Sequence, residues 1–144
     1  MIEPDTIKLL RECDAGVKMG ISSIDDVIDD VKSAELKKFL VDCKNEHVEL
    51  DREIQELLNK YDDEGKQPNP IAKGMSRMKT NVKLAVKESD DTIADLMTDG
   101  CNMGVKSLNK YLNEYGAAEE KTKDIAKKLI KIEEKLADEI RGFL

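Results

Sequence analysis

Apolar residues recur along most of the chain at alternating steps of three and four, the spacing that places side chains on one face of an α-helix. A first stripe of this kind runs from Ile7 to Val31, and a second runs from Leu36 to Tyr61. Ser33 precedes the second stripe and is predicted to cap that helix, because its hydroxyl can accept a hydrogen bond from a free backbone N–H. The short turn near residue 32 predicts that these two helices form an antiparallel hairpin.

The last part of the chain repeats this arrangement. Ser89 and the acidic residues after it are predicted to begin a helix whose apolar stripe ends at Tyr115, and Gly116 is predicted to end that helix. A final helix follows, with apolar residues spaced from Ile125 to Phe143. These two helices are predicted to form a second antiparallel hairpin.

Between the hairpins, residues 62–68 break the pattern, and Asn69 and Pro70 are predicted to begin a shorter helix. That helix would rise roughly 26 Å at 1.5 Å per residue, enough to carry the chain from one end of a bundle back to the other. The predicted fold class is therefore all-α, an antiparallel four-helix bundle with up-down-down-up topology and a shorter crossover helix, five helices in all. The predicted single domain covers residues 1–144, divided into hairpin 5–62, crossover helix 69–88 and hairpin 89–144.

One stretch of the sequence occurs twice. Residues 16–24, GVKMGISSI, recur as residues 100–108, GCNMGVKSL. Each glycine inside a helix costs about 1 kcal/mol relative to alanine, so the four glycines need a compensating role. We interpret them as sites where the first and fourth helices approach closely. The alternative is that glycine clears space beside a metal ion or a small ligand.

With this internal repeat, the chain resembles a small bacterial family of unknown function in the ferritin-like superfamily, whose first and third bundle helices each carry a Gly-Glu pair. Ferritin-like di-iron sites take one Glu from each of two helices and a Glu-x-x-His from each of the other two. Here the residues after Gly16 and Gly100 are Val17 and Cys101. The resemblance places the other slots on Lys44, His47, Leu129 and Ile132. No carboxylate stands at any of these positions, so the resemblance implies that the di-iron centre is lost.

His47 is the single histidine and falls on an apolar stripe. This favours a core histidine that is satisfied by water or by a carboxylate such as Asp14. The alternative is a residual site for one transition metal (Zn, Cu or Fe), whose mixed nitrogen and sulfur ligands suit Zn(II) or Cu(I). Its candidate ligands are His47, Cys101, Cys43 and Asp14. A catalytic pair of Cys101 and His47 is disfavoured, because buried cysteine is usually inert.

The composition narrows the classes of function. The chain of 144 residues is 38% charged and 3% aromatic, which is typical of long amphipathic helices with an aliphatic core. Its net charge of -7 disfavours nucleic acids and anionic membranes as partners. Cys13, Cys43 and Cys101 have no CxxC spacing, which indicates reduced thiols and a cytoplasmic protein. The charge-rich residues 127–135 are predicted to form a solvent-exposed face.

These observations predict a non-enzymatic structural or stress-associated module that uses no cofactor and forms a homodimer through a helix face. The alternative function is a metal-binding protein or metal-dependent oxidoreductase that uses the residual histidine and cysteines. A third possibility, a helical adaptor for another protein, would require an exposed apolar patch.

Overall fold

The computed structural model of the protein describes residues 2–68 and 89–144. Within these residues it contains four long helices, two short 3-10 helices and no strand, which confirms the all-α fold class. The bounds are Pro4–Val27 for α1, Ile28–Asp30 for η1, Ala34–Lys60 for α2, Asp90–Glu114 for α4, Glu120–Glu139 for α5 and Arg141–Phe143 for η2. The predicted crossover helix at 69–88 lies outside the described residues.

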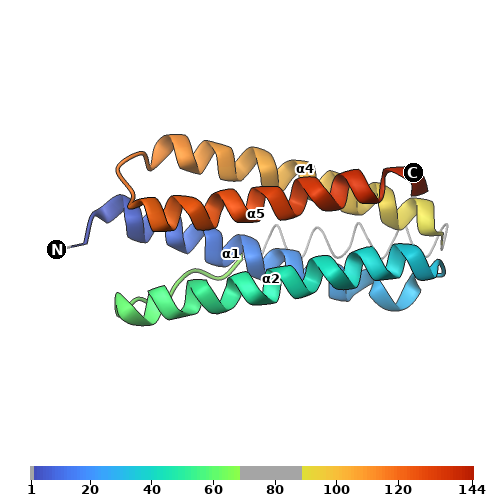
Figure 1. Ribbon diagram of the computed structural model, residues 1–144, viewed down its shortest axis with the longest axis horizontal. Coiled ribbons are helices and arrows are strands. Elements are labelled where there is room, and N and C mark those ends of the chain that lie inside the picture. The colour runs from blue at the N-terminus through green and yellow to red at the C-terminus, as the bar shows by residue number, and fades with distance from the viewer. Residues whose placement is uncertain (1, 69–88) are drawn as a thin grey trace.

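The four long helices lie side by side along one axis (Figure 1). In this view α1 and α5 run in one direction, and α2 and α4 run in the opposite direction. The contacts are most extensive within the two hairpins, α1 with α2 and α4 with α5, and α5 also packs on both helices of the first hairpin. The turns that close the two hairpins lie at opposite ends of the bundle (Figure 1).

The first turn of α4 binds the turn of the other hairpin. The carboxylate of Asp90 accepts hydrogen bonds from the backbone N–H groups of Lys32 and Ser33, at 2.9 and 2.8 Å. Ser33 also caps α2 as predicted, because its Oγ accepts a hydrogen bond of 3.2 Å from the N–H of Leu36. Ser89 occupies the equivalent position before α4, but its side chain makes no capping hydrogen bond.

A matching contact ties the other end of the bundle. Asp5 and Thr6, in the first turn of α1, accept hydrogen bonds from the backbone N–H groups of Ala117 and Glu119, at 3.1 and 2.9 Å. N–H groups beside a helix start have no partner within the helix and need an acceptor from elsewhere. Each hairpin therefore supplies acceptors for the turn of the other hairpin.

After α2 the chain returns along the bundle as a strap, which we define as residues 61–68 (Figure 1). Gly65 in this strap has a φ of 77°, in the left-handed region that favours glycine. A Cβ at Gly65 would also overlap the carboxylate of Asp14 and lie 2.9 Å from Leu58. The glycine therefore allows the strap to lie directly against α1, where Lys66 N–H donates a 2.9 Å hydrogen bond to Asp14.

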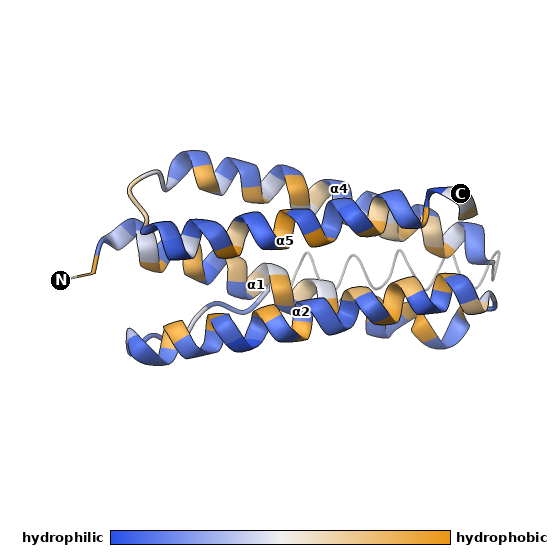
Figure 2. Cartoon of the chain, viewed as in Figure 1, coloured by the Kyte–Doolittle hydropathy of each residue, from blue (hydrophilic) through white to orange (hydrophobic). Residues whose placement is uncertain are grey.

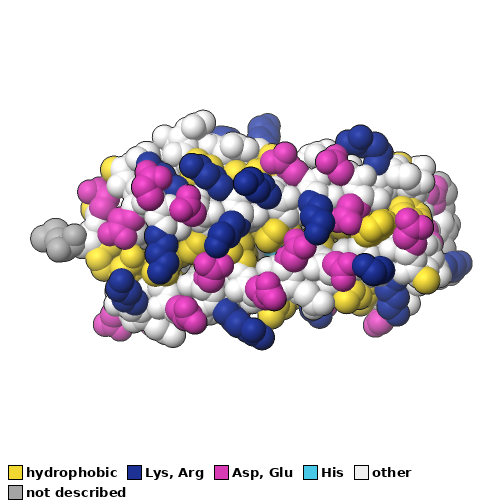
Figure 3. Space-filling model, viewed as in Figure 1, with side chains coloured by type: hydrophobic (Ala, Val, Ile, Leu, Met, Phe, Trp, Pro, Cys, Tyr) yellow, Lys and Arg dark blue, Asp and Glu magenta, His cyan; other side chains and the backbone are white. Residues whose placement is uncertain are grey.

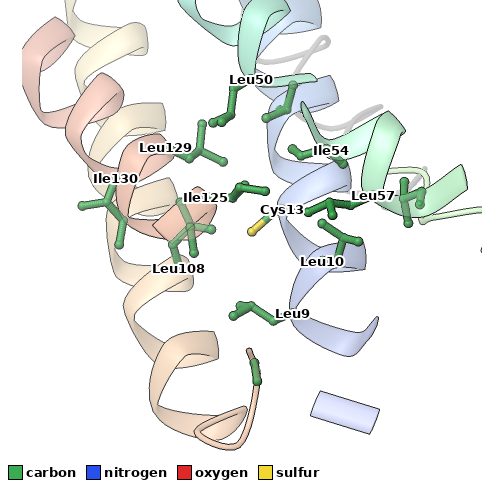
Figure 4. Packing of buried hydrophobic residues seen from close by; sticks show 14 residues of the cluster. Leu9, Leu10, Cys13, Leu50, Ile54, Leu57, Leu108, Ile125, Leu129 and Ile130 are labelled. Carbon is green, nitrogen blue, oxygen red and sulfur yellow. The ribbon is translucent and has the colours of Figure 1, made fainter. Parts of the chain in front are cut away.

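Hydrophobic residues of the four helices face one another and hydrophilic residues face outward (Figure 2). The buried apolar side chains form two clusters. The first, called the Leu9 cluster, includes Leu9, Leu10, Cys13, Val17, Leu50 and Leu129, and Cys13 lies among leucine and isoleucine side chains (Figure 4). The second, called the Leu40 cluster, includes Ile24, Leu36, Leu40, Cys43, Cys101 and Leu136.

Charged side chains of both signs cover the face formed by α2 and α5 (Figure 3). Lys128 pairs with Glu53 at 3.3 Å and Lys135 pairs with Glu46 at 2.8 Å, so α5 is joined to α2 by surface ion pairs. Such exposed pairs contribute about 0.2–1 kcal/mol each, and the apolar clusters dominate the stability. In the described part of the chain, no helix carries an apolar stretch long enough to cross a membrane.

Candidate functional site

His47 lies inside the bundle on α2, with only 2% of its surface exposed. Its Nδ1 is 2.8 Å from the backbone carbonyl oxygen of Cys43, one helical turn earlier. A carbonyl oxygen only accepts hydrogen bonds, so Nδ1 carries a proton and donates it. The ring is thereby oriented, and Nε2 points away from α2 toward α5.

Glu133 of α5 is the group that Nε2 faces. Its Oε1 lies 3.8 Å from His47 Nε2, which is longer than a hydrogen bond. Among the described residues, neither His47 Nε2 nor Glu133 Oε2 has a hydrogen-bond partner. Burial raises the pKa of the Glu133 carboxyl, and the nearby His47 offsets only part of this effect. The mid-bundle site is therefore a buried acid and a buried imidazole that face each other.

The second glycine of each repeated stretch makes room for one member of this pair. A Cβ at Gly20 would overlap the His47 ring, and a Cβ at Gly104 would overlap the Glu133 carboxylate. Gly100, by contrast, has no atom within 4 Å of the position of a Cβ. The prediction that these glycines bring the first and fourth helices together is wrong. Gly20 and Gly104 instead leave space for a polar side chain from the other helix of their own hairpin.

The pair lies at the boundary between the two apolar clusters. On α2, His47 falls between Cys43 of the Leu40 cluster and Leu50 of the Leu9 cluster. Glu133 falls at the same boundary on α5, and Cys101 of α4 is close enough for the Glu133 carboxyl to raise the pKa of its thiol. All four helices therefore contribute to this layer.

The three cysteines are buried and carry free thiols. Burial raises the pKa of Cys13 to about 12, and burial together with Glu133 raises that of Cys101 to about 12. Burial, Cys101 and Glu133 also raise the pKa of Cys43. These thiols are protonated at neutral pH, and a protonated thiol is a poor nucleophile and a poor metal ligand. The structure offers no support for a catalytic cysteine in this layer.

Asp14 is not the partner of His47, and that prediction is wrong. Its side chain is fully buried, with 0% exposure, and its carboxylate accepts three hydrogen bonds. The donors are Lys18 Nζ at 2.9 Å, Gln55 Nε2 at 2.8 Å and the backbone N–H of Lys66 at 2.9 Å. The strap and the neighbouring helix turns thus satisfy Asp14 in a separate network.

The structure brings together only part of the predicted metal set. Cys43 and His47 are in contact, with Sγ 3.6 Å from Nδ1, and Cys101 lies nearby. Asp14 is engaged elsewhere, and Lys44 points outward to an ion pair with Asp25. Across residues 2–68 and 89–144, no group of three or more His, Cys, Asp or Glu side chains is arranged to hold a metal ion.

Comparison with known proteins identifies the family of this chain. The family model described as Domain of unknown function (DUF2383) matches residues 5–114, which is most of the chain. The chain belongs to the DUF2383 family. Among curated proteins, none matches this chain.

The DUF2383 chain is also similar to a solved structure, a DUF305 fragment from Deinococcus radiodurans, with a TM-score of 0.75. The similarity covers 98% of this chain and 95% of that fragment at 11% sequence identity. An identity this low shows a shared helical fold and carries no functional information. The family match includes His47 and both glycine repeats and ends before Glu133.

Glu133 is the residue of the mid-bundle site that the sequence did not predict in this DUF2383 protein. It belongs to residues 127–135, which were predicted to be exposed, yet it is 9% exposed. The α4–α5 turn extends to Glu119 instead of centring on Gly116, so the facing positions on α5 lie further along the chain. A sequence signal was present, because Ala126, Ile130 and Glu133 follow one another at helical spacing on a second buried line of α5.

Proposed function

We propose that this DUF2383 protein is a non-enzymatic structural module, built as a ferritin-like bundle whose di-iron centre has been lost. The observation that carries the proposal is the set of side chains in the central layer. Val17 and Leu129 occupy two of the predicted ligand positions, and both are fully buried and apolar. One carboxylate, Glu133, and one imidazole, His47, are too few ligands to neutralise two buried iron ions.

The helix directions support the ferritin-like part of the proposal. Because α2 and α4 run in the same direction (Figure 1), the end of α2 and the start of α4 lie at opposite ends of the bundle. One long connection between two antiparallel hairpins is the arrangement of ferritin-like folds. The up-down-down-up topology and the role of residues 69–88 as a crossover remain parts of this proposal.

The alternative function, binding of a single transition metal by His47 and the cysteines, stays a prediction. It would require Cys43 or Cys101 to lose its proton in a layer where burial and Glu133 raise the pKa of both thiols. Metal binding would therefore have to release protons and overcome this cost. This is why we favour the structural role.

Metal analysis tests the proposal. The wild-type protein, purified without chelators and then supplemented with Fe(II), Zn(II), Mn(II) or Cu(I), is expected to retain far less than one metal ion per chain after desalting. Near-stoichiometric metal that is lost in Cys43→Ser and Cys101→Ser, but kept in Cys13→Ser, would overturn it. Cys13 is the matched control, because it is equally buried but lies in the Leu9 cluster. Iron oxidation by oxygen should not exceed that of buffer.

We further propose the homodimer as the working assembly of this module. Val41, Met103 and Leu144 are large apolar side chains that are exposed by 38%, 69% and 60%. Light scattering after size exclusion should then give twice the chain mass of 16.2 kDa. A mass of one chain at all concentrations would rule out the dimer.

A further inference from the structure

We propose that His47 and Glu133 form a proton-binding site in the core, in which a neutral Glu133 carboxyl faces the free nitrogen of a neutral His47 ring, and that loss of this proton weakens the bundle. The support comes from the geometry of the pair and from the groups that surround it.

The geometry assigns the protons. His47 Nδ1 must carry a proton, because its 2.8 Å partner is a carbonyl oxygen. His47 Nε2 faces Glu133 Oε1 at 3.8 Å, and neither Nε2 nor Oε2 has another partner in the described part of the chain. A carboxyl proton directed at Nε2 would give the acid a donor role and the imidazole an acceptor role. An ionised Glu133 beside the same neutral ring would leave no proton between the two groups.

The surroundings disfavour an ionised Glu133. Next to the pair, α1 contributes Gly20, and α4 contributes Gly104 and the neutral thiol of Cys101. The helix α2 contributes the neutral thiol of Cys43. No lysine or arginine among the described residues lies within ion-pair distance of the Glu133 carboxylate. Burial of a charge without a compensating partner is costly, so the neutral acid is favoured.

The nearby surface charges do not change this assignment. Glu46 of α2 and Lys135 of α5 neutralise each other at 2.8 Å on the surface. Lys44 of α2 is turned toward Asp25 of α1. Glu139, further along α5, raises the pKa of the Cys43 thiol, as Glu133 does, so it adds negative charge near the layer. None of these groups places an unpaired positive charge beside the Glu133 carboxyl.

The consequence is a dependence of stability on pH. In the unfolded chain Glu133 ionises near its ordinary pKa of 4.5, whereas burial raises this pKa in the folded protein. Between these two values the folded state binds one proton more at Glu133 than the unfolded state does. Through this group the unfolding equilibrium constant rises with pH, by up to about tenfold per pH unit for one proton. The contribution of Glu133 to stability is fully present below pH 4.5 and is lost as pH rises through its raised pKa.

Urea unfolding of the full chain between about pH 5.5 and 8.5 tests this linkage. Glu133→Gln keeps the shape and a donor to Nε2 but cannot ionise, so its unfolding constant should rise less with pH than that of wild type. Glu46→Gln is the matched control, since it removes a half-exposed carboxylate one residue from His47, and it should keep the wild-type slope. Parallel curves for wild type and Glu133→Gln would overturn the proposal.

A second measurement needs no variant. Because His47 is the single histidine, a ¹⁵N-edited spectrum of the imidazole ring reports this residue alone. We expect one protonated nitrogen, Nδ1, and one unprotonated nitrogen, Nε2, at neutral pH. Two protonated ring nitrogens would mean a histidinium opposite an ionised Glu133, and this outcome would also overturn the proposal.

Discussion

Within residues 2–68 and 89–144, the bundle contains two buried carboxyl groups in opposite situations. Asp14 is 0% exposed and accepts hydrogen bonds from three donors, one of which is the cationic Lys18. Glu133 is 9% exposed and faces a single imidazole at 3.8 Å, and its Oε2 has no hydrogen-bond partner among the described residues. The two acids share nearly the same degree of burial, so burial alone does not decide how a carboxyl group is accommodated.

The difference lies in what the fold brings to each acid. Asp14 lies beneath the strap, where the backbone N–H of Lys66 is free to donate because the strap is not helical. Glu133 lies mid-helix among other helices, where backbone N–H groups are already used within each helix. A buried acid in a helical bundle therefore finds donors beside irregular backbone and lacks them between continuous helices.

The largest expected effect comes from adding an acid to the Leu9 cluster, which offers it no donor. Val17 is fully buried there, so Val17→Glu should lower the free energy of unfolding by several kcal/mol, because the new carboxyl has no compensating donor. Val41→Glu is the control, since Val41 is 38% exposed and its replacement should change stability by less than about 0.5 kcal/mol. Equal urea midpoints for the two variants would contradict the placement of Val17.

Removing the satisfied acid should have the next largest effect. Asp14→Ala removes the acceptor of the Lys66 backbone N–H and of one Gln55 N–H, both partly buried, and should cost about 3 kcal/mol. Hydrogen exchange of the Lys66 amide should accelerate at the same time, because the strap loses its anchor. The control Asp42→Ala removes an exposed i, i+4 ion pair and should cost less than about 1 kcal/mol. An unchanged hydrogen-exchange rate of the Lys66 amide would show that other contacts hold the strap.

The first and second glycines of the repeated stretches differ in what surrounds them. Gly20→Ala places a methyl group against the His47 ring and should cost about 1–3 kcal/mol. Gly100→Ala meets open space and should instead stabilise the helix by up to about 1 kcal/mol. Thermal melting of both variants gives the comparison directly. Shifts of the same sign would mean that His47 does not depend on the space beside Gly20.

The smallest expected effect concerns the outer edge of the strap. Arg11 donates hydrogen bonds to Asp63 at 2.6 and 3.0 Å, which lowers the pKa of Asp63 below its ordinary value of 3.8. The pair is exposed, so Arg11→Ala should cost less than about 1 kcal/mol at neutral pH. This contribution is present above pH 3.8 and is lost as pH falls through the lowered pKa. Acid titration of both proteins should therefore show curves that converge at low pH.

Local patterns predicted the helices well, because helical spacing and capping are properties of neighbouring residues. The cap at Ser33 and the buried stripes of α1 and α2 followed directly from the sequence. The partner of His47 did not, because it depends on the exact length of the α4–α5 turn. One or two residues in that turn decide whether Ile132 or Glu133 faces the layer.

Asp14 shows the second limit of sequence reasoning. Its position on the first apolar stripe suggested a partner across the hairpin. The observed donors come partly from the strap, which the sequence marks only as a break in helical spacing. A loop that returns along the helices leaves no periodic signal, although Gly65 and its required positive φ were a local clue.

The contacts exchanged at the two ends of the bundle make each hairpin depend on the other. Asp90 and the pair Asp5 and Thr6 each serve a turn that belongs to the other half. One hairpin expressed alone would keep its own acceptor side chains, but the N–H groups of its turn would lack an acceptor. A second identical hairpin could supply that acceptor by associating with the first. In the present chain both hairpins belong to one polypeptide, so each hairpin always has the other beside it to complete its turn.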